Sequence, residues 1–247
     1  TAYIRAIENP FAIEVADVEA EKASGLIEII GENVDTEYLK EVKDVNINQQ
    51  LIDEYGKDMK IVYTPLHGTG EMLARRAFAQ AGFDSVQVVE AQCVPDPDFS
   101  TVKSPNPENQ AAFSLAEELG RKVGADVLVA TDPDADRVGM ACKNSDGEWV
   151  LINGNQTCLL FLWYIITNRQ AVGKMKPTDF IVKTIVTTEV IRKIAEKQHV
   201  EMRDCYTGFK WIAREIALSE GKQQYIGGGE ESYGFLHVDS ALIVNLH

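Results

Sequence analysis

The stretch VLVATDPDADRVGMAC (residues 127–142) sets a short acidic loop between two apolar runs. Short apolar runs on either side of a turn predict two buried strands. The loop carries Asp132, Asp134 and Asp136 at alternate positions and ends at Arg137. Alternate loop residues can direct their side chains to one point, where three carboxylates need a cation to offset their repulsion. Such oxygen ligands favour Mg²⁺, Ca²⁺ or Mn²⁺.

Other loops with closely spaced aspartates differ from this one. An EF-hand needs a glycine at its sixth position and a carboxylate at its twelfth, but counting from Asp132 gives Arg137 and Lys143. Haloacid-dehalogenase-type phosphatases also place Asp-x-Asp after a strand, with the first aspartate as nucleophile. They require threonine or valine where this chain has Asp136, and a late acidic pair that we do not find, so this interpretation is a less favoured alternative. A plain solvated loop fits poorly, because Arg137 and an apolar strand follow at once.

Strand and helix patterns alternate on both sides of the acidic loop. Residues 61–63 predict a strand, TPLHGTG (64–70) a loop, and an amphipathic helix then leads to a strand at 86–89, which completes a βαβ crossover. Residues 181–184 resemble residues 61–64 and also precede an amphipathic helix. The pattern predicts an α/β protein with two similar three-layer α/β/α domains, whose sheets are mixed but mostly parallel.

The same patterns suggest domain boundaries. Residues 1–45 are weakly patterned and are expected to be a lead-in segment from a preceding domain, followed by α/β domains at 46–148 and 149–247. Asp146-Gly147 predicts a hairpin turn near the second boundary, and an apolar helix over 156–166 opens the second domain.

Composition limits the class of protein. The 247 residues are 45% hydrophobic, enough for an ordinary core, and the longest apolar stretch (159–166) is too short to cross a bilayer. The net charge of −14 argues against nucleic-acid binding, which depends on lysine and arginine clusters. The N-terminus has no secretory pattern, and the four cysteines are scattered without a metal-ligand spacing. We therefore expect a cytoplasmic protein with reduced cysteines.

The acidic loop resembles the metal-binding loop of the α-D-phosphohexomutases, the phosphoglucomutase/phosphomannomutase family, whose pattern is D-x-D-x-D-R after a strand. Four further motifs follow in family order: TPLHGTG (64–70), SPNPEN (104–109), TGFKWIA (207–213) and GGGEESYGF (227–235). The resemblance implies that the chain holds family domains 2 and 3 without domains 1 and 4, and that domain 3 lacks the acidic, glycine-containing segment and the helix that usually follow Phe235 in the family. It also implies that Asp132, Asp134 and Asp136 bind Mg²⁺ and that Arg137 acts at the phosphate groups.

The last two motifs are expected to bind the substrate. Lys210 follows Thr207 and Gly208 at the start of a predicted helix, where backbone N–H groups favour an anion. By resemblance, this segment contacts substrate phosphate or sugar. The resemblance also assigns Glu230 and Ser232 to the sugar hydroxyls and leaves the residue between them unassigned.

Several other residues are expected to be structural. His67 could suggest a general base, but a histidine between leucine and glycine is more often structural. Ser104 resembles the family's phosphorylated serine only superficially, because proline replaces the histidine of the T-[AS]-S-H-N-P motif. Lys183, Arg192 and Arg214 are expected to be ordinary strand or helix charges.

The resemblance implies a reversible phosphoryl transfer between hexose 1-phosphate and hexose 6-phosphate, through a phosphoserine and a 1,6-bisphosphate intermediate. Glucose and mannose phosphates are both candidate substrates. The sequence contains neither the serine motif nor the R-x-S-G-T phosphate clamp, so the chain alone is expected to be inactive. The alternative is a non-catalytic module that binds metal and sugar phosphate.

Overall fold

The protein is described by a computed structural model that covers residues 2–237, and it divides into two compact units, Thr1–Tyr38 and Leu39–His247. In the first unit, Asp17 accepts a hydrogen bond from the Ala20 N–H (2.8 Å) and so begins the second helix. No residue of the short helices in this unit is buried. These helices are α1 (Ala2–Arg5), η1 (Pro10–Ala12) and α2 (Val18–Ser24).

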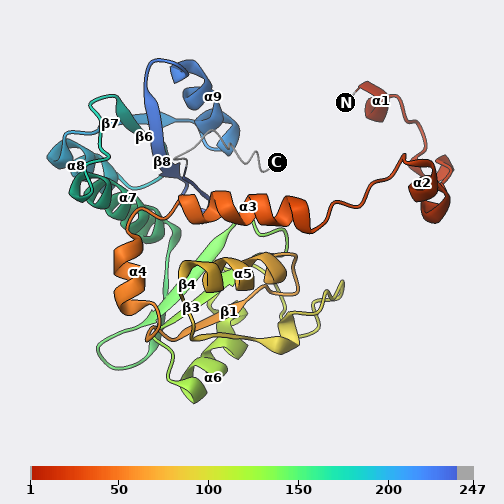
Figure 1. Ribbon diagram of the computed structural model, residues 1–247, viewed down its shortest axis with the longest axis horizontal. Helices are drawn as coiled ribbons and strands as arrows, with labels where there is room; N and C mark the ends of the chain where they lie inside the picture. Colours follow the sequence, from red (N-terminus) through yellow and green to blue (C-terminus); the bar gives the residue numbers. More distant parts are fainter. Residues whose placement is uncertain (1, 238–247) are drawn as a thin grey trace. The chain divides into compact units, whose positions relative to one another are not determined.

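The second unit begins within a longer helix and holds a five-stranded sheet of order β2-β1-β3-β4-β5 (Figure 1). Strands β2, β1 and β3 are parallel, whereas β4 and β5 are antiparallel to their neighbours. The elements are α3 (Glu32–Asp44), α4 (Gln49–Tyr55), β1 (Ile61–Thr64), α5 (Glu71–Ala81), β2 (Val86–Val88), η2 (Glu90–Gln92), η3 (Gln110–Phe113), α6 (Ser114–Val123), β3 (Val127–Thr131), β4 (Val138–Lys143) and β5 (Trp149–Ile152).

A second sheet of order β7-β6-β8-β9 follows, in which only β9 is antiparallel. The helix before it begins with a capping box, in which Asn153 and Gln156 each accept a hydrogen bond from the backbone N–H of the other. This helix is longer than the predicted 156–166. The elements are α7 (Gly154–Ala171), β6 (Asp179–Thr184), α8 (Val190–Gln198), β7 (Glu201–Cys205), α9 (Phe209–Ser219), β8 (Gln224–Gly229) and β9 (Phe235–Leu236).

Helices cover both faces of the first sheet, because alternate residues of a strand point to opposite sides. In β1, Val62 belongs to the apolar cluster that includes Ala116 of α6. Its neighbour Tyr63 meets Phe78 of α5 with ring centroids 6.0 Å apart. Figure 1 shows α5 and α6 on the two sides of this sheet.

The second sheet is covered in the same way. Ile181 of β6 lies in the cluster formed with α7 and α8, which includes Ile191. The next residue, Val182, lies in a separate cluster with Ile212 of α9. Both domains are therefore α/β/α sandwiches with mixed sheets, which confirms the predicted fold class.

The two sheets also share one topology. In each, a central strand is followed by a helix and a parallel edge strand, and then by a second helix and a parallel strand on the other side. An antiparallel strand comes next in both. The β3–β4 loop and the β8–β9 loop therefore occupy equivalent places in the two domains. This common topology extends the repeat suggested by residues 61–64 and 181–184.

The structure shifts the domain limits that the sequence suggested. The Asp146-Gly147 turn folds β5 back onto β4, and Trp149 is buried in the first core. Residues 149–152 thus belong to the first sheet, so the first domain extends beyond residue 148. The predicted limit at residue 46 lies inside the second compact unit, which begins at the buried Leu39. Residues 238–247 of the predicted second domain lie outside the described residues.

Membrane insertion is not supported by any described helix. Within residues 2–237, none combines the length and apolarity that a bilayer span requires.

Candidate functional site

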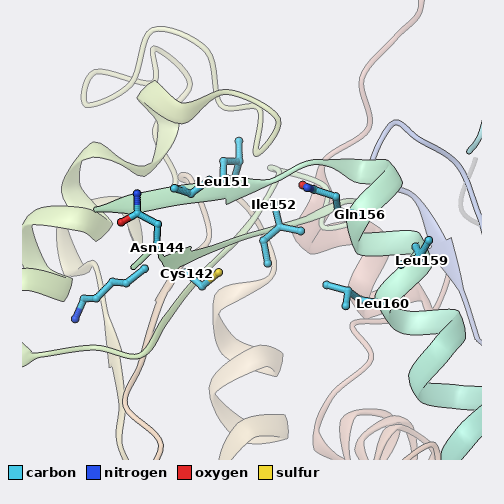
Figure 2. Close-up of a pocket in the computed structure, with 9 residues that line it drawn as sticks. Cys142, Asn144, Leu151, Ile152, Gln156, Leu159 and Leu160 are labelled. Carbon is cyan, nitrogen blue, oxygen red and sulfur yellow. The ribbon is translucent and has the colours of Figure 1, made fainter. Parts of the chain in front are cut away.

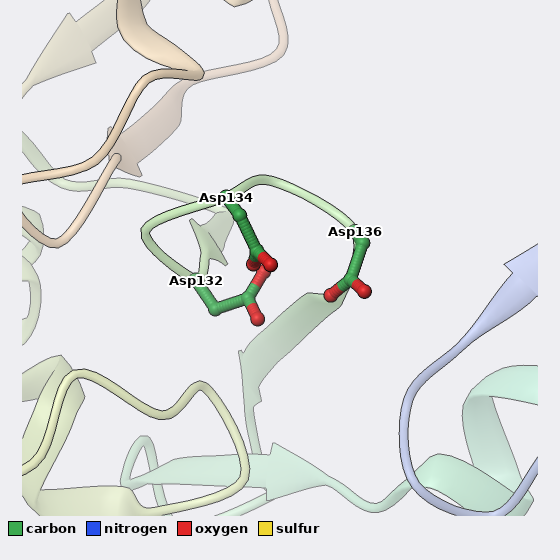
Figure 3. Close-up of side chains that lie close together, drawn as sticks. All are labelled: Asp132, Asp134 and Asp136. Atoms are coloured by element: carbon green, nitrogen blue, oxygen red, sulfur yellow. The ribbon is translucent and has the colours of Figure 1, made fainter. Parts of the chain in front are cut away.

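The acidic loop between β3 and β4, here called the aspartate loop (residues 132–137), brings three carboxylates to one point. One oxygen from each of Asp132, Asp134 and Asp136 lies within 4.8 Å of the others (Figure 3). The chain turns at Ala135, whose φ is +60° and whose N–H donates to the Asp132 carbonyl (3.0 Å). This turn lets alternate side chains converge, so the structure places the predicted ligands together.

Arg137 is held by carboxylates on several sides. Asp132 is 1% exposed, and its two oxygens accept hydrogen bonds from the Arg137 backbone N–H (3.0 Å) and Nε (2.9 Å). The guanidinium also donates to Glu108 (3.3 Å), and its Nε lies 3.7 Å from Asp136 Oδ1. The side chain of Arg137 remains 37% exposed, so an anion can approach it while these pairs hold its orientation.

The donor set of this loop fits a hard divalent cation. Three aspartates converge here, and the guanidinium of Arg137 pairs with two of them and with Glu108. Asp136 Oδ1 is buried and accepts no hydrogen bond from the described residues. A buried anionic oxygen needs a partner, and clustered carboxylate oxygens suit Mg²⁺ or Mn²⁺. The role of the three aspartates as ligands stays a prediction that this geometry supports.

The β8–β9 loop (residues 230–234) carries the second group of predicted site residues. Glu230 is 7% exposed and accepts a hydrogen bond from the Gly208 N–H, while its own N–H donates to the Gly234 carbonyl (3.0 Å). Burial raises the pKa of the Glu230 carboxyl, while hydrogen bonds from Gly208 and Ser232 act against that increase. The structure thus brings Glu230, Ser232 and Gly208 together.

The start of α9 places the remaining predicted residues in solvent. Thr207 and Lys210 are exposed, and Lys210 Nζ lies 5.4 Å from the ring centroid of Trp211. Arg214 approaches the same ring at 5.6 Å. Because α9 begins at Phe209, its first N–H groups point toward the Gly208–Glu230 contact. This end of the helix can accept an anion beside the β8–β9 loop.

Lys183 is a residue whose environment the sequence reasoning missed. It was expected to be an ordinary strand charge, but it is 0% exposed at the end of β6. Its Nζ lies 2.8 Å from both Glu189 and Asp204, and Arg192 contacts the same two carboxylates. The Nζ also donates to the Thr187 carbonyl (3.0 Å). A lysine within the apolar run IVKT is the only sequence signal of this network.

Replacement of Lys183 tests the strength of this network. Lys183→Met is expected to lower the free energy of unfolding by about 1–3 kcal/mol, because it leaves buried carbonyls without a donor and leaves Arg192 as the one remaining cation beside Glu189 and Asp204 in this network. Urea unfolding followed by circular dichroism measures the change. Lys193→Met on the exposed side of α8 is the control and should change it by less than about 0.5 kcal/mol. Equal effects of the two substitutions would contradict a stabilising network.

His67 and Ser104 have surroundings that agree with structural roles. The ring of the buried His67 uses both nitrogens, with Val94 O at 2.9 Å and Thr101 Oγ1 at 2.7 Å. Ser104 is exposed, and its hydroxyl receives only a long contact from Asn109 (3.5 Å). Neither residue contacts the three aspartates within the hydrogen bonds of the described chain.

A cavity of about 410 Å³ lies between β4, β5 and α7 (Figure 2). Its lining is mostly apolar and includes Cys142, Val150, Leu151, Ile152 and Leu160. Large apolar cavities often mark binding sites. The lining of this one contains no carboxylate and none of the predicted site residues.

Known protein families match both halves of the chain. The family described as phosphoglucomutase/phosphomannomutase, alpha/beta/alpha domain II, matches residues 36–147, and domain III of the same family matches residues 153–243. Phosphoglucomutases of Staphylococcus aureus strain USA300 and Staphylococcus epidermidis are 36% identical to the chain over 235 and 238 residues. These matches cover 95% and 96% of the chain but only 40% and 41% of the relatives, so the chain spans about two fifths of their length.

Solved structures show the same fold. A phosphoglucomutase/phosphomannomutase family protein from Burkholderia thailandensis matches with a TM-score of 0.62 and 16% identity, over 90% of this chain and 44% of that one. N-acetylphosphoglucosamine mutase from Aspergillus fumigatus matches with a TM-score of 0.58 and 14% identity, over 85% and 42%. The chain therefore belongs to the phosphoglucomutase/phosphomannomutase family and carries its α/β/α domains II and III.

Proposed function

We propose that this chain supplies the metal-binding and sugar-reading loops of a phosphohexomutase, which interconverts hexose 1-phosphate and hexose 6-phosphate through a phosphoserine and a 1,6-bisphosphate. The convergence of Asp132, Asp134 and Asp136 within 4.8 Å, beside Arg137, carries the proposal. Homologues 36% identical to the chain are phosphoglucomutases, which supports isomerase chemistry in the longer protein.

Each group of residues has a distinct task in this proposal. The three aspartates hold Mg²⁺, which when bound offsets negative charge on the phosphoserine and the transferring phosphoryl group. Arg137 approaches the phosphate oxygens with the part of its guanidinium that solvent reaches. Glu230 and Ser232 hold the sugar hydroxyls. Lys210, with Thr207 and Gly208 beside it, contacts substrate phosphate or sugar at the start of α9.

Two solved structures of one relative support this choice of ligands. The Aspergillus fumigatus N-acetylphosphoglucosamine mutase has been solved in complex with GlcNAc-6P and magnesium. A serine-to-alanine variant of the same enzyme has been solved in complex with glucose 1,6-bisphosphate. We propose that this chain likewise binds Mg²⁺ and a hexose phosphate or bisphosphate.

The reactive serine and the phosphate clamp are assigned to the family's other two domains. Neither motif occurs in these 247 residues, so we expect no mutase turnover from this polypeptide alone. A cytoplasmic location and the lack of a nucleic-acid partner stay predictions from composition.

Calorimetry tests the proposal directly. The chain should bind one Mg²⁺ and, in its presence, glucose 1,6-bisphosphate, while glucose 1-phosphate with the bisphosphate and Mg²⁺ should give no turnover in a coupled assay. Turnover at an ordinary enzymatic rate would contradict the missing-serine argument. Failure to bind either ligand would contradict the site assignment. Hydrolysis of a simple phosphate ester that Asp132→Asn abolishes would favour the phosphatase alternative.

A further inference from the structure

The loop between β1 and α5 (residues 65–70) lies directly against the aspartate loop. The Thr69 N–H donates to the Pro133 carbonyl (2.8 Å), and the Thr69 hydroxyl donates to the same oxygen (3.2 Å). Pro133 is the residue between Asp132 and Asp134. These two hydrogen bonds therefore hold the backbone that separates two of the proposed ligands.

Gly68 makes an even closer approach to the same residue. A Cβ atom at Gly68 would lie 2.3 Å from Pro133 Cα and 2.4 Å from its carbonyl oxygen. Ordinary contacts begin near 3.4 Å, so any side chain would push the backbone of Pro133 away. The φ of Gly68 is not in the left-handed region. The glycine is therefore required by the contact and not by its own backbone conformation.

The β1–α5 loop also contacts the two ends of the turn. A Cβ atom at Gly70 would lie 3.0 Å from Thr131 Oγ1 and 3.3 Å from Ala135 Cβ. The Tyr63 hydroxyl is hydrogen bonded to Thr131 Oγ1 (2.8 Å) at the start of the aspartate loop. The buried ring of His67, held by two hydrogen bonds, fixes the β1–α5 loop itself. The aspartate loop thus packs against a loop that is itself held by buried hydrogen bonds.

We propose that the β1–α5 loop determines the metal selectivity of the aspartate loop, with Gly68 and Thr69 as positioning residues that act through Pro133. Mg²⁺ requires near-octahedral oxygens at about 2.0–2.1 Å, whereas Ca²⁺ accepts about six to eight oxygens at about 2.3–2.6 Å in flexible geometry. The contacts to Pro133 restrict the backbone between Asp132 and Asp134, and a restricted set of ligands suits the strict geometry of Mg²⁺ better than the flexible geometry of Ca²⁺. A displaced backbone weakens Mg²⁺ binding more than Ca²⁺ binding.

The second domain contains a similar arrangement at the equivalent loop. Thr184, the last residue of β6, and Thr187, in the loop that follows, place their hydroxyl oxygens 3.4 and 3.3 Å from the Glu231 carboxylate. The two hydroxyl oxygens lie 2.7 Å apart, so one hydroxyl donates to the other, which leaves the second hydrogen for Glu231. In both domains the loop after the central strand therefore holds the loop that carries the predicted site residues. This parallel supports a positioning role for the β1–α5 loop.

Separate calorimetric titrations of the chain with Mg²⁺ and with Ca²⁺ test the proposal. Gly68→Ala is expected to lower Mg²⁺ affinity about tenfold, as changes outside the ligand shell commonly do, and Ca²⁺ affinity less than about threefold. Thr69→Val should shift the ratio of the two affinities in the same direction by a smaller factor. Thr69→Ser keeps the hydroxyl donor and should therefore keep the wild-type ratio of the two affinities.

Gly120→Ala is the control for a general loss of stability. Its Cβ would lie 2.8 Å from Leu128 Cδ2, in the core of the first domain. The substitution therefore disturbs this core without touching the aspartate loop, and the ratio of the Mg²⁺ and Ca²⁺ affinities should stay unchanged. If Gly68→Ala does not fold, the comparison of Thr69→Val with Thr69→Ser tests the proposal instead. Equal losses for both ions, or no loss, would overturn the proposal. Because it rests on the proposed metal function, a wild-type chain that binds neither ion would instead refute that function.

Discussion

Asp134→Asn is expected to lower the Mg²⁺ affinity of the chain about 100-fold, or roughly 2.7 kcal/mol, because a neutral amide replaces one of three anionic ligands. The same change should stabilise the metal-free protein. One carboxylate oxygen of Asp134 lies within 4.8 Å of oxygens of Asp132 and Asp136. At such a distance the repulsion between two carboxylates in water-like surroundings is about 1 kcal/mol per pair, and the substitution removes it. A metal ligand should show both a weaker Mg²⁺ affinity and a more stable metal-free protein, whereas substitution of a solvated acid should change neither.

Thermal unfolding with and without Mg²⁺ measures both effects in one experiment. An ion at about 100 times its dissociation constant adds roughly 2.7 kcal/mol to the stability of the wild-type protein, and Asp134→Asn should lose most of this gain. Asp98→Asn, at an exposed position of the same domain, is the control and should keep it. A variant that responds to Mg²⁺ as the wild type does would show that Asp134 is not a ligand.

Glu230→Gln is expected to weaken binding of glucose 1,6-bisphosphate about 10- to 100-fold, because hydrogen bonds to a charged group contribute about 1.5–3 kcal/mol each. The amide can still accept the hydrogen bond from the Gly208 N–H. The loss therefore reports the missing charge and not a collapsed loop. Ligand titration followed by nuclear magnetic resonance measures the affinity. Glu220→Gln, at an exposed residue after α9, is the control, and an equal affinity in both variants would contradict a sugar-binding role.

The same substitution should change how stability depends on pH. Burial raises the pKa of Glu230 above its unfolded value, so the folded state holds this proton more tightly. The stabilisation from the protonated form is complete below the unfolded pKa and is lost as the pH rises through the folded pKa. Glu230→Gln imitates the protonated form, so it should be more stable than the wild type at neutral pH. Chemical unfolding at pH 4 and pH 7 checks this, and a variant less stable at both would contradict it.

Local patterns of the sequence determined much of the fold. The β-branched run at residues 61–64, the helix after it and the parallel strand that follows were predictable, because strand and helix periodicities depend on neighbouring residues alone. The same holds for the aspartate loop, since residues two apart in a tight turn converge without outside help. The helix predicted at 156–166 begins earlier, because Asn153 and Gln156 form its capping box, and it continues to Ala171.

Contacts between distant residues were decided by the tertiary structure. The sequence predicts an ordinary strand charge at Lys183, whereas in the fold Glu189 and Asp204 enclose its ammonium group. Only folding brings such partners together, since they come from separate elements.

The acidic stretch at residues 132–137 shows both contributions. Its sequence alone determined that three carboxylates and an arginine share one turn, because the spacing of a short loop fixes which side chains can meet. Only the tertiary structure decided how firmly that turn is held, since Thr69 reaches Pro133 across 64 positions of the chain. The hydrogen bonds and the close contact of Gly68 depend on β1 and β3 lying side by side. No local pattern encodes that pairing, because it arises from burial of both strands in a common core.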